Sequence, residues 1–533
     1  MFVEEVRRPY KDKVYTAVLL RETYREGKKV KHRTLANLSA LPKDVIEIIK
    51  RSLKGEAFYA AGDSFRITSS VSHGAAFCAL KVAQELGLPK MLGNSWWRDL
   101  VLAMVIARVV SPGSKRFTRE WVKLTSIPRY LKIPERLTVN SFYEAMDALL
   151  KKQADIETSL AKRHLREGCL VLYDLSSSYL EGNRCPLAEY GYSRDKKRGK
   201  KQFAYGLLTD QEGRPVSIQV FRGNASDTST VLSQIDKLQR KFGFQKVVFC
   251  GDRGMITETR IDELKKAGYD WITALRAKAV QSLHAQGVIQ LGLFDERNIA
   301  EIYDPKTPNE RLIVCKNPMV AEERRRKREE MLQATETALK RVKERVEKGR
   351  LSRPEAIAMA VGRVIDRYKM AKHFSCTIKE GFFDFQRKED SIAKEAALDG
   401  IYVLRTSVDP SELDAEGVSS GYKSLKHVER AFRTMKQGHL ELRPVFHRLE
   451  DRVRAHAFLC MLAYYIQWHM ERELVPLRAE RPKEYGSFRL LLERLGSIQL
   501  HTVLIRGCSF EQVTEPGPFE QKILDRLGVR TLL

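Results

Sequence analysis

The pattern of apolar residues changes sharply at Cys169, and this change most limits the folds open to the chain. Helical spacing gives way to short apolar runs and alternating segments, with a turn at 210–213. The predicted elements are strands 169–173, 201–208 and 215–221, helix 226–242 with Ser226 or Asp227 as N-cap, strand 246–250, helix 257–267 and strand 271–275. This order predicts an α/β RNase H-like catalytic core, a mixed sheet flanked by helices.

The segments around this core predict a multidomain chain, since 533 residues exceed the size of one hydrophobic core. The core is expected over 168–276 and 398–475, interrupted by an insertion domain and preceded by a mainly helical N-terminal domain. The other predicted regions are a β-hairpin and helix region at 1–70, with strands 14–24 and 30–38, a helical domain at 71–167 expected to bind DNA, the insertion at 277–397, and a C-terminal helical region at 476–533.

The insertion is recognised by its charge. Residues 321–348 are rich in Arg, Lys and Glu, and Leu332, Leu339, Val342 and Val346 are spaced for one face of a helix. This spacing predicts a solvated amphipathic helix. The apolar segment 400–405 then restores a strand of the core.

The charge balance indicates a polyanionic partner. Lys and Arg number 94 against 68 Asp and Glu, a formal charge of +26. The longest apolar runs, 100–110 and 458–466, are shorter than the roughly 20 residues that cross a bilayer. No secretory leader opens the sequence. We therefore expect a cytoplasmic protein without a membrane partner, and nucleic acid as the polyanion.

Several classes of site lack sequence support. The eight cysteines are scattered, without the C-x-x-C or Cys-His spacing of a zinc site, so reduced and mostly buried thiols are expected. No phosphate-binding loop of the G-x-x-x-x-G-K-[ST] type occurs, nor a dinucleotide-binding G-x-G-x-x-G in a suitable context. These absences disfavour ATP hydrolysis and dinucleotide binding.

Two aspartates follow the apolar runs of predicted neighbouring strands. Asp174 comes directly after 171–173, and Asp252 comes after 247–251. Metal-dependent phosphodiester cleavage needs such acidic oxygen ligands to converge, because Mg²⁺ is a hard cation. A single Asp at this position is more often a turn or a helix cap. Together the two aspartates indicate a metal site.

A third acidic residue lies in the segment 421–437, which reads GYKSLKHVERAFRTMKQ. On a helix, Tyr422, Leu425, Glu429 and Lys436 fall on roughly one face. Such a face can present a carboxylate to a metal and an ammonium group to a phosphate. An ordinary surface helix has the same spacing, so spacing alone leaves both interpretations open.

This segment resembles the Y-x2-R-x3-E-x6-K motif of DDE transposases from bacterial insertion sequences, in the insertion-sequence-four superfamily. Tyr422, Glu429 and Lys436 match the motif, and Leu425 replaces its Arg, with Lys426 beside it. The resemblance extends over about 170–467, in the blocks 171–182, 191–210, 221–230, 247–255 and 442–466.

The resemblance implies a mechanism and partners. Asp174, Asp252 and Glu429 are expected to bind two Mg²⁺ or Mn²⁺ ions that activate water to nick the transposon end, after which the freed 3′-hydroxyl attacks target DNA. Tyr422 and Lys436 are expected to hold phosphate. The implied partners are double-stranded DNA, as terminal inverted repeats and target, and a second copy of the chain in a homodimer with DNA. The implied location is the nucleoid of a bacterial cytoplasm.

Basic residues predict the DNA path. Arg253 follows the second aspartate, and six cations crowd one loop: Arg194, Lys196, Lys197, Arg198, Lys200 and Lys201. A merely solvated loop is the rival interpretation. Two other functions stay open: an RNase H-like nuclease or resolvase without strand transfer, and a non-catalytic DNA-binding relative. The presence of all three carboxylates disfavours the second of these.

Overall fold

The computed structural model describes residues 1–10, 13–56, 58, 65–182, 184–194, 197, 199–290, 294, 297–436, 438–505 and 508–532. The chain forms two compact units, described separately below: 1–72 with 497–516, and 73–496 with 517–532. Within the described part of the chain, no helix combines the length and apolar character needed to span a membrane.

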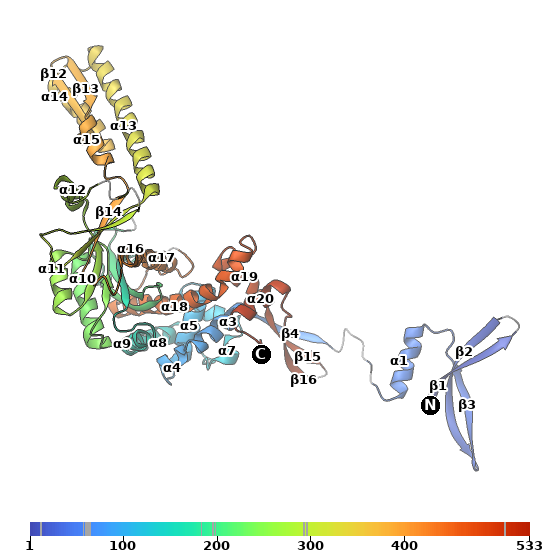
Figure 1. Ribbon diagram of the computed structural model, residues 1–533. Helices are drawn as coiled ribbons and strands as arrows, with labels where there is room; N and C mark the ends of the chain where they lie inside the picture. The colour runs from blue at the N-terminus through green and yellow to red at the C-terminus, as the bar shows by residue number, and fades with distance from the viewer. Residues whose placement is uncertain are drawn as a thin grey trace. The chain divides into compact units, whose positions relative to one another are not determined.

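The first unit consists mostly of strands (Figure 1). Its described residues form two antiparallel sheets and the helix α1 (Lys43–Leu53). One sheet contains β1 (Phe2–Tyr10), β2 (Lys13–Glu26) and β3 (Lys29–Asn37), and the other contains β4 (Arg66–Ser72), β15 (Gln499–Ile505) and β16 (Cys508–Val513). The second sheet joins distant parts of the chain. For example, the Thr68 hydroxyl donates to the carbonyl of Thr502, 434 residues away.

Two predictions are therefore wrong. The N-terminal region is not mainly helical from its beginning, since its first 72 residues are mostly strands. Strand β1 was missed because its side chains show no regular alternation of apolar and polar residues, whereas the predicted strands 14–24 and 30–38 correspond to β2 and β3. The C-terminal region is not helical throughout either, because β15 and β16 lie within it. Their partner β4 is too distant in sequence to be recognised from local pattern.

The second unit is built on an eight-stranded mixed sheet with the strand order β10-β11-β14-β9-β8-β5-β6-β7. The predicted order of seven elements is confirmed: β5 (Leu170–Tyr179), β6 (Gln202–Asp210), β7 (Pro215–Arg222), α10 (Asp227–Asp236) continued by the π-helical turn η1 (Lys237–Phe242), β8 (Val248–Cys250), α11 (Glu258–Lys266) and β9 (Asp270–Ala274). Strand β5 pairs antiparallel with β6 and parallel with β8. Ser226 caps α10, as predicted, by accepting from the Ser229 N–H.

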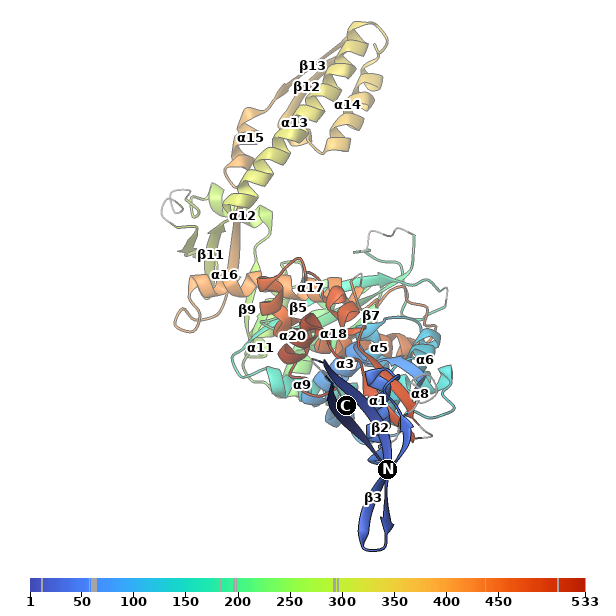
Figure 2. The same ribbon diagram turned by 90° about the vertical axis from the view of Figure 1, so that its right-hand side faces the viewer.

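The predicted insertion begins later than expected. Strands β10 (Ile299–Ile302) and β11 (Arg311–Lys316), which follow α12 (Ala277–Ala285), join the core sheet through β14 (Ile401–Thr406). The remaining elements lie together in Figure 2: α13 (Pro318–Glu347), α14 (Pro354–Tyr368), the 3₁₀ turn η3 (Ala371–His373), β12 (Phe374–Lys379), β13 (Phe382–Arg387) and α15 (Glu389–Ala396). They share their own core, which includes all four apolar residues predicted for one face of α13.

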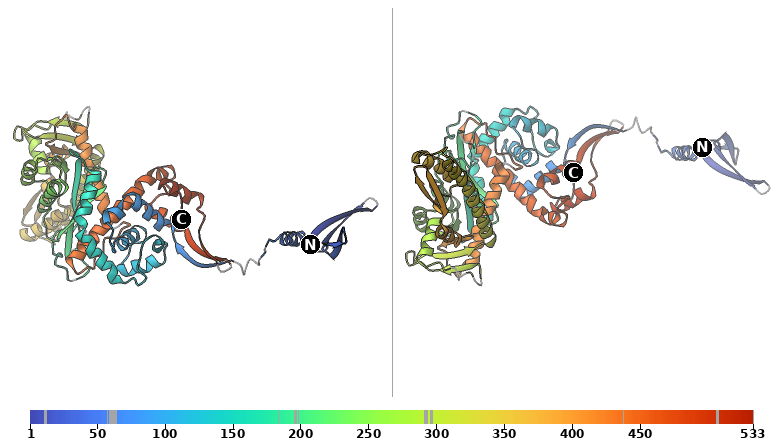
Figure 3. Two further views of the ribbon diagram at one scale, coloured as in Figure 1. Left: turned by 90° about the horizontal axis from the view of Figure 1, so that it is seen from below. Right: turned by 90° about the horizontal axis from the view of Figure 1, so that it is seen from above.

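Helices cover both sides of the sheet and pack against one long helix. Helices α10 and α11 lie on one side, and α16 (Ala415–Lys423) and α17 (Leu425–Lys436) lie on the other (Figure 1). The long helix α18 (Glu450–Glu480) contacts α3, α5, α8, α17, α20 and β7, and Figure 3 shows it beside the early helices. The other helices are α3 (Gly74–Glu85), α4 (Leu88–Leu92), α5 (Arg98–Val110), α6 (Lys115–Lys123), α7 (Ile127–Tyr130), α8 (Val139–Lys151), α9 (Gln153–His164), α19 (Phe488–Leu495) and α20 (Pro518–Arg526). The helices predicted as a separate domain at 71–167 thus share one unit with the sheet.

Candidate active site

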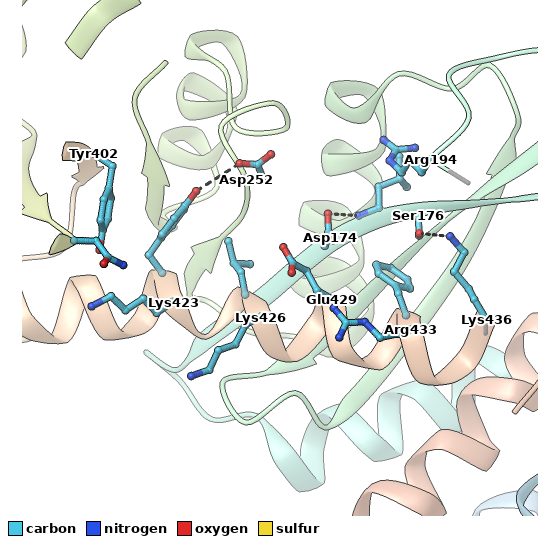
Figure 4. A pocket seen from close by; sticks show the side chains of 15 residues that line it. Asp174, Ser176, Arg194, Asp252, Tyr402, Lys423, Lys426, Glu429, Arg433 and Lys436 are labelled. Atoms are coloured by element: carbon cyan, nitrogen blue, oxygen red, sulfur yellow. Dashed lines mark hydrogen bonds between the residues drawn. The ribbon is translucent and has the colours of Figure 1, made fainter. Parts of the chain in front are cut away.

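A pocket of about 730 Å³ opens between the sheet and α17. The three acidic residues singled out in the sequence, Asp174, Asp252 and Glu429, all line it (Figure 4). So do Tyr422 and Lys436 from the same helical segment. The structure therefore brings together residues that come from three separate parts of the chain.

The register of two parallel strands sets the positions of the aspartates. Leu172 of β5 lies opposite Cys250 of β8. Asp174 and Asp252 each come two residues after this pair, so they occupy matching positions along neighbouring strands, which lie about 4.8 Å apart. Asp252 leaves the end of β8, as predicted. Asp174 does not end its strand, because β5 continues to Tyr179, and its side chain reaches the pocket by the alternation of a strand.

Glu429 is presented by α17. This helix packs its buried residues Val428, Ala431, Phe432 and Met435 toward the sheet, where it contacts β5 and β6. The predicted continuous helix is in fact two, since α16 ends at Lys423 and α17 begins at Leu425. Tyr422, Leu425, Glu429 and Lys436 still line one pocket, so the face predicted from spacing is present.

The carboxyl group of Asp174 is perturbed by its surroundings. Burial raises its pKa to about 7, and repulsion from Glu429 and Asp252 acts in the same direction. The Leu175 N–H donates to Asp174 Oδ1 at 2.8 Å and opposes this shift, as does the positive charge of Arg194. A neutral or cation-bound carboxyl group is thus favoured at this position.

Asp252 and Glu429 are more open to solvent than Asp174. Asp252 Oδ1 accepts a hydrogen bond from the backbone N–H of Arg253 at 2.7 Å and from the Tyr422 hydroxyl at 3.5 Å. Burial raises the pKa of Tyr422, and the charge of Asp252 adds to this effect. Tyr422 therefore stays protonated and remains a donor toward Asp252.

Lys436 lies at the other end of the pocket in Figure 4. The residue is only 9% exposed, and its Nζ donates to Ser176 Oγ at 2.9 Å. Ser176 follows Asp174 by two residues on β5, so both side chains reach the same face of the sheet. The Lys436 ammonium group is thereby held on the same face of the sheet as the Asp174 carboxyl group.

The predicted DNA-binding residues separate into several positions. Arg194 lines the pocket and pairs with Asp227. Lys200 instead pairs with Glu181 at 2.8 Å. Arg253 lines a neighbouring pocket of about 520 Å³ at the base of α13, together with Arg324 and Lys327. The exposed Lys197 and the half-buried Lys201 do not line the carboxylate pocket. Lys196 and Arg198 lie outside the described residues.

Sequence reasoning missed several residues that line the pocket. Arg433 is four residues after Glu429, so helical spacing from that glutamate was a signal for it. Lys423 directly follows Tyr422, and Ser176 lies two residues after Asp174, so both are close in sequence to predicted site residues. Asn317 and Tyr402 come from the β11 and β14 segments. Asn317 was expected to lie in the insertion, outside the core, and Tyr402 was expected in a core strand but gave no local signal of a site residue.

The donor set suits a divalent cation, because three carboxylates are hard oxygen ligands and Asp174 gains from a nearby positive charge. In the described part of the chain, however, no group of three or more His, Cys, Asp or Glu side chains is already arranged to hold a metal ion. The carboxylates therefore form an open set. Such a set matches the preference of Mg²⁺ for one or two carboxylates plus phosphate and water oxygens.

Comparison with protein families identifies the chain. The family described as "Transposase DDE domain" matches residues 165–466, which include the three carboxylates and the whole pocket. The chain belongs to the DDE transposase family. The N-terminal domain of IS1634 family transposases matches residues 3–63 of this DDE transposase.

Other comparisons give weaker likenesses. No curated protein matches the sequence of this transposase. Among solved structures, a piggyBac transposase synaptic complex with hairpin DNA is 11% identical with a TM-score of 0.36, covering 79% of this chain and 76% of that one. A Mos1 transposase paired-end complex with a left transposon end is 15% identical with a TM-score of 0.15, covering 32% and 56%. Neither likeness is close enough to support an argument about this chain.

Proposed function

We propose that this chain cuts the ends of a transposon and joins them to target DNA by metal-dependent phosphoryl transfer. The observation that carries the proposal is the convergence of Asp174, Asp252 and Glu429 on one pocket from β5, the end of β8 and α17. The order β7-β6-β5-β8-β9, with β5 parallel to β8, supports an RNase H-like core. The segment 421–437 supports membership of the insertion-sequence-four superfamily, with Leu425 in place of Arg.

Asp174, Asp252 and Glu429 are the proposed ligands of two Mg²⁺ or Mn²⁺ ions. When bound, such ions lower the pKa of the attacking water or 3′-hydroxyl and neutralise charge that builds up on the phosphate. The raised pKa of Asp174, about 7, means that metal binding also releases a proton from this carboxyl group near neutral pH. Cleavage should therefore rise with pH through this range.

The other pocket residues have proposed roles in holding DNA. Lys436 is fixed on Ser176 and can contact a phosphate oxygen from the side opposite Asp252. Tyr422 orients Asp252 through its hydroxyl group and can donate to a phosphate when that contact opens. Arg194 adds positive charge beside Asp174. These groups position the phosphodiester against the carboxylates, and such positioning is the main work of a protein in phosphoryl transfer.

The proposed partners are double-stranded DNA, both as terminal inverted repeats and as target, and a second copy of the chain in the DNA complex. Arg253, Lys197, Lys200 and Lys201 are the proposed phosphate contacts outside the pocket, and Lys196 and Arg198 are further proposed phosphate contacts. The net charge of +26 suits this role. The helices of 71–167 are the proposed reader of the transposon ends, and the bacterial nucleoid is the proposed location.

The test uses the DNA that flanks this reading frame. Purified full-length chain is mixed with a labelled fragment carrying the flanking sequence, a target plasmid and Mg²⁺, and nicked and joined products are separated on gels. Both products are expected for the wild type, and neither for Asp174→Asn, Asp252→Asn or Glu429→Gln, all of which should still bind DNA. Glu416→Gln is the matched control, since Glu416 is an exposed residue of α16 outside the pocket. Hydrolysis without joining would indicate a nuclease or resolvase, and binding without cutting a non-catalytic relative.

A further inference from the structure

Two tyrosines beside the carboxylate pocket are unusually exposed. The exposed fraction is 64% for Tyr190 and 82% for Tyr192, and only Gly191 separates them. Tyrosine rings usually bury most of their apolar area, so two rings displayed within three residues form an apolar patch that calls for a partner.

The backbone that carries these rings is held tightly. The Gln202 side chain, only 2% exposed, donates to the Tyr192 carbonyl at 2.8 Å and to the Gly223 carbonyl at 3.1 Å. A Cβ atom on Gly191 would lie 2.1 Å from the Gly223 carbonyl oxygen, so the two backbones are in direct contact. The tyrosines are therefore exposed on a segment fixed to the sheet. The entropic cost of ordering this backbone when a ligand binds the rings is therefore small.

Cations accompany both rings and connect them to the pocket. The Arg194 guanidinium carbon lies 6.0 Å from the Tyr192 ring centroid, and Lys201 Nζ lies 5.8 Å from that of Tyr190. Arg194 also lines the carboxylate pocket, where Figure 4 shows it beside Asp174. Arg194 thus links Tyr192 to the pocket, and Tyr190 lies two residues before Tyr192.

We propose that Tyr190 and Tyr192 are a stacking platform for unpaired bases of the DNA strand whose phosphate occupies the carboxylate pocket. This inference rests on the proposed function. Every base has a π-face that can stack on tyrosine, and nearby cations attract the phosphates on either side. A fully paired duplex hides its base faces. The platform therefore recognises DNA that has been opened next to the reacting phosphate.

The test compares unpaired with paired DNA. Full-length chain in EDTA, which prevents cleavage, is titrated with an oligo-dT of about 12 nucleotides and with a blunt duplex. The double variant Tyr190→Ala/Tyr192→Ala should bind the oligo-dT about 10-fold more weakly and the duplex within about twofold of wild type. The double Phe variant should bind like wild type, because the rings remain. A 2-aminopurine placed in the oligo should be quenched by wild type but not by the Ala variant.

Tyr303→Ala is the matched control, since Tyr303 is also 64% exposed in the same unit but is distant in sequence from Arg194 and the other residues of the proposed platform. Equal loss on both DNAs, no loss on oligo-dT, or an equal loss with Tyr303→Ala would overturn the inference. The proposed function is judged by a different measurement. If wild type cleaves and joins DNA but the tyrosines have no effect on oligo-dT, only the platform fails. If the tyrosine effect is present without any cleavage, the proposed function fails.

Discussion

The carboxylate pocket and a basic cluster in the same unit both contain buried ionisable groups, but burial shifts the pKa values of these groups in opposite directions. The basic cluster consists of Arg108, Lys115, His447 and His456. In the pocket, burial raises the pKa of Asp174 to about 7. In the cluster, burial lowers the pKa of Lys115 to about 7 and that of His447 to about 3, and nearby basic groups add to both shifts.

The two regions differ in how their charges are satisfied. The Arg108 guanidinium donates to three backbone carbonyls, those of Gly113 at 2.8 Å and of Leu440 and Glu441 at 3.4 Å each. The Arg108 charge is thus satisfied by backbone carbonyls of the chain, and these hydrogen bonds link α5 to the segment before α18. In the pocket, Asp252 and Glu429 remain exposed. A buried charge whose hydrogen bonds are made within the chain, such as that of Arg108, indicates a structural role. Carboxylates that repel one another and remain accessible to solvent are suited to bind an external cation.

The largest expected difference between the two regions is in cleavage. Asp252→Asn or Glu429→Gln should lower the rate of DNA nicking by about 1000-fold, because a proposed ligand of the metal ions is lost. Lys115→Met should leave the rate within about threefold of wild type, because the basic cluster acts only on the fold. Single-turnover nicking of a labelled end measures both. A Lys115→Met variant as inactive as the carboxylate variants would erase the distinction.

The free energy of unfolding should depend on the basic cluster more than the rate of cleavage does. Arg108→Met should lower the free energy of unfolding by about 3 kcal/mol, because three carbonyls lose their donor. Denaturant unfolding followed by circular dichroism measures the loss. Arg430→Met is the control, since the Arg430 side chain is 63% exposed and its pair with Glu471 should contribute less than about 1 kcal/mol. Equal losses would show that Arg108 is not specially placed.

The pocket should also have a pH signature in the absence of metal. The folded pKa of Asp174, about 7, exceeds its ordinary value of 3.8, so the folded chain binds more protons between these values. Its contribution to stability is complete below pH 3.8 and is lost as pH rises through 7. Asp174→Asn removes this loss and should stabilise the metal-free chain by about 2 kcal/mol above neutral pH. Parallel stability curves for the two proteins in EDTA would contradict the shift.

The basic cluster should give a pH effect of similar size and opposite sign. The folded pKa of Lys115, about 7, lies below its ordinary value of 10.5, so the unfolded chain binds more protons between these values. Stability should therefore rise between pH 7 and 10.5, and Lys115→Met should flatten this rise by about 2 kcal/mol. Chemical unfolding at several pH values measures the slope. An unchanged slope in the variant would mean that Lys115 is not buried as a neutral amine.

The candidate site was more predictable than the fold around it. The acidic residues were recognised because each has a local signal, an apolar run or a helical face, that is weak alone, and because 421–437 resembles a known motif. The edge of the sheet was not recognised. Strands β10 and β11 were read as part of an insertion, since their pairing with β14 depends on residues about 90 positions away, such as Leu312 opposite Arg405.

The three carboxylates were singled out with the help of the resemblance at 421–437. By itself the sequence determined the order of strands and helices in the core and the face of α17. These follow from periodicity and side-chain chemistry, which act over a few residues. Only the tertiary structure decided that Leu172 lies opposite Cys250, that Asp174 is partly buried, and that Gly191 packs on Gly223. Contacts between distant segments depend on register and packing, and neither leaves a periodic trace along the chain.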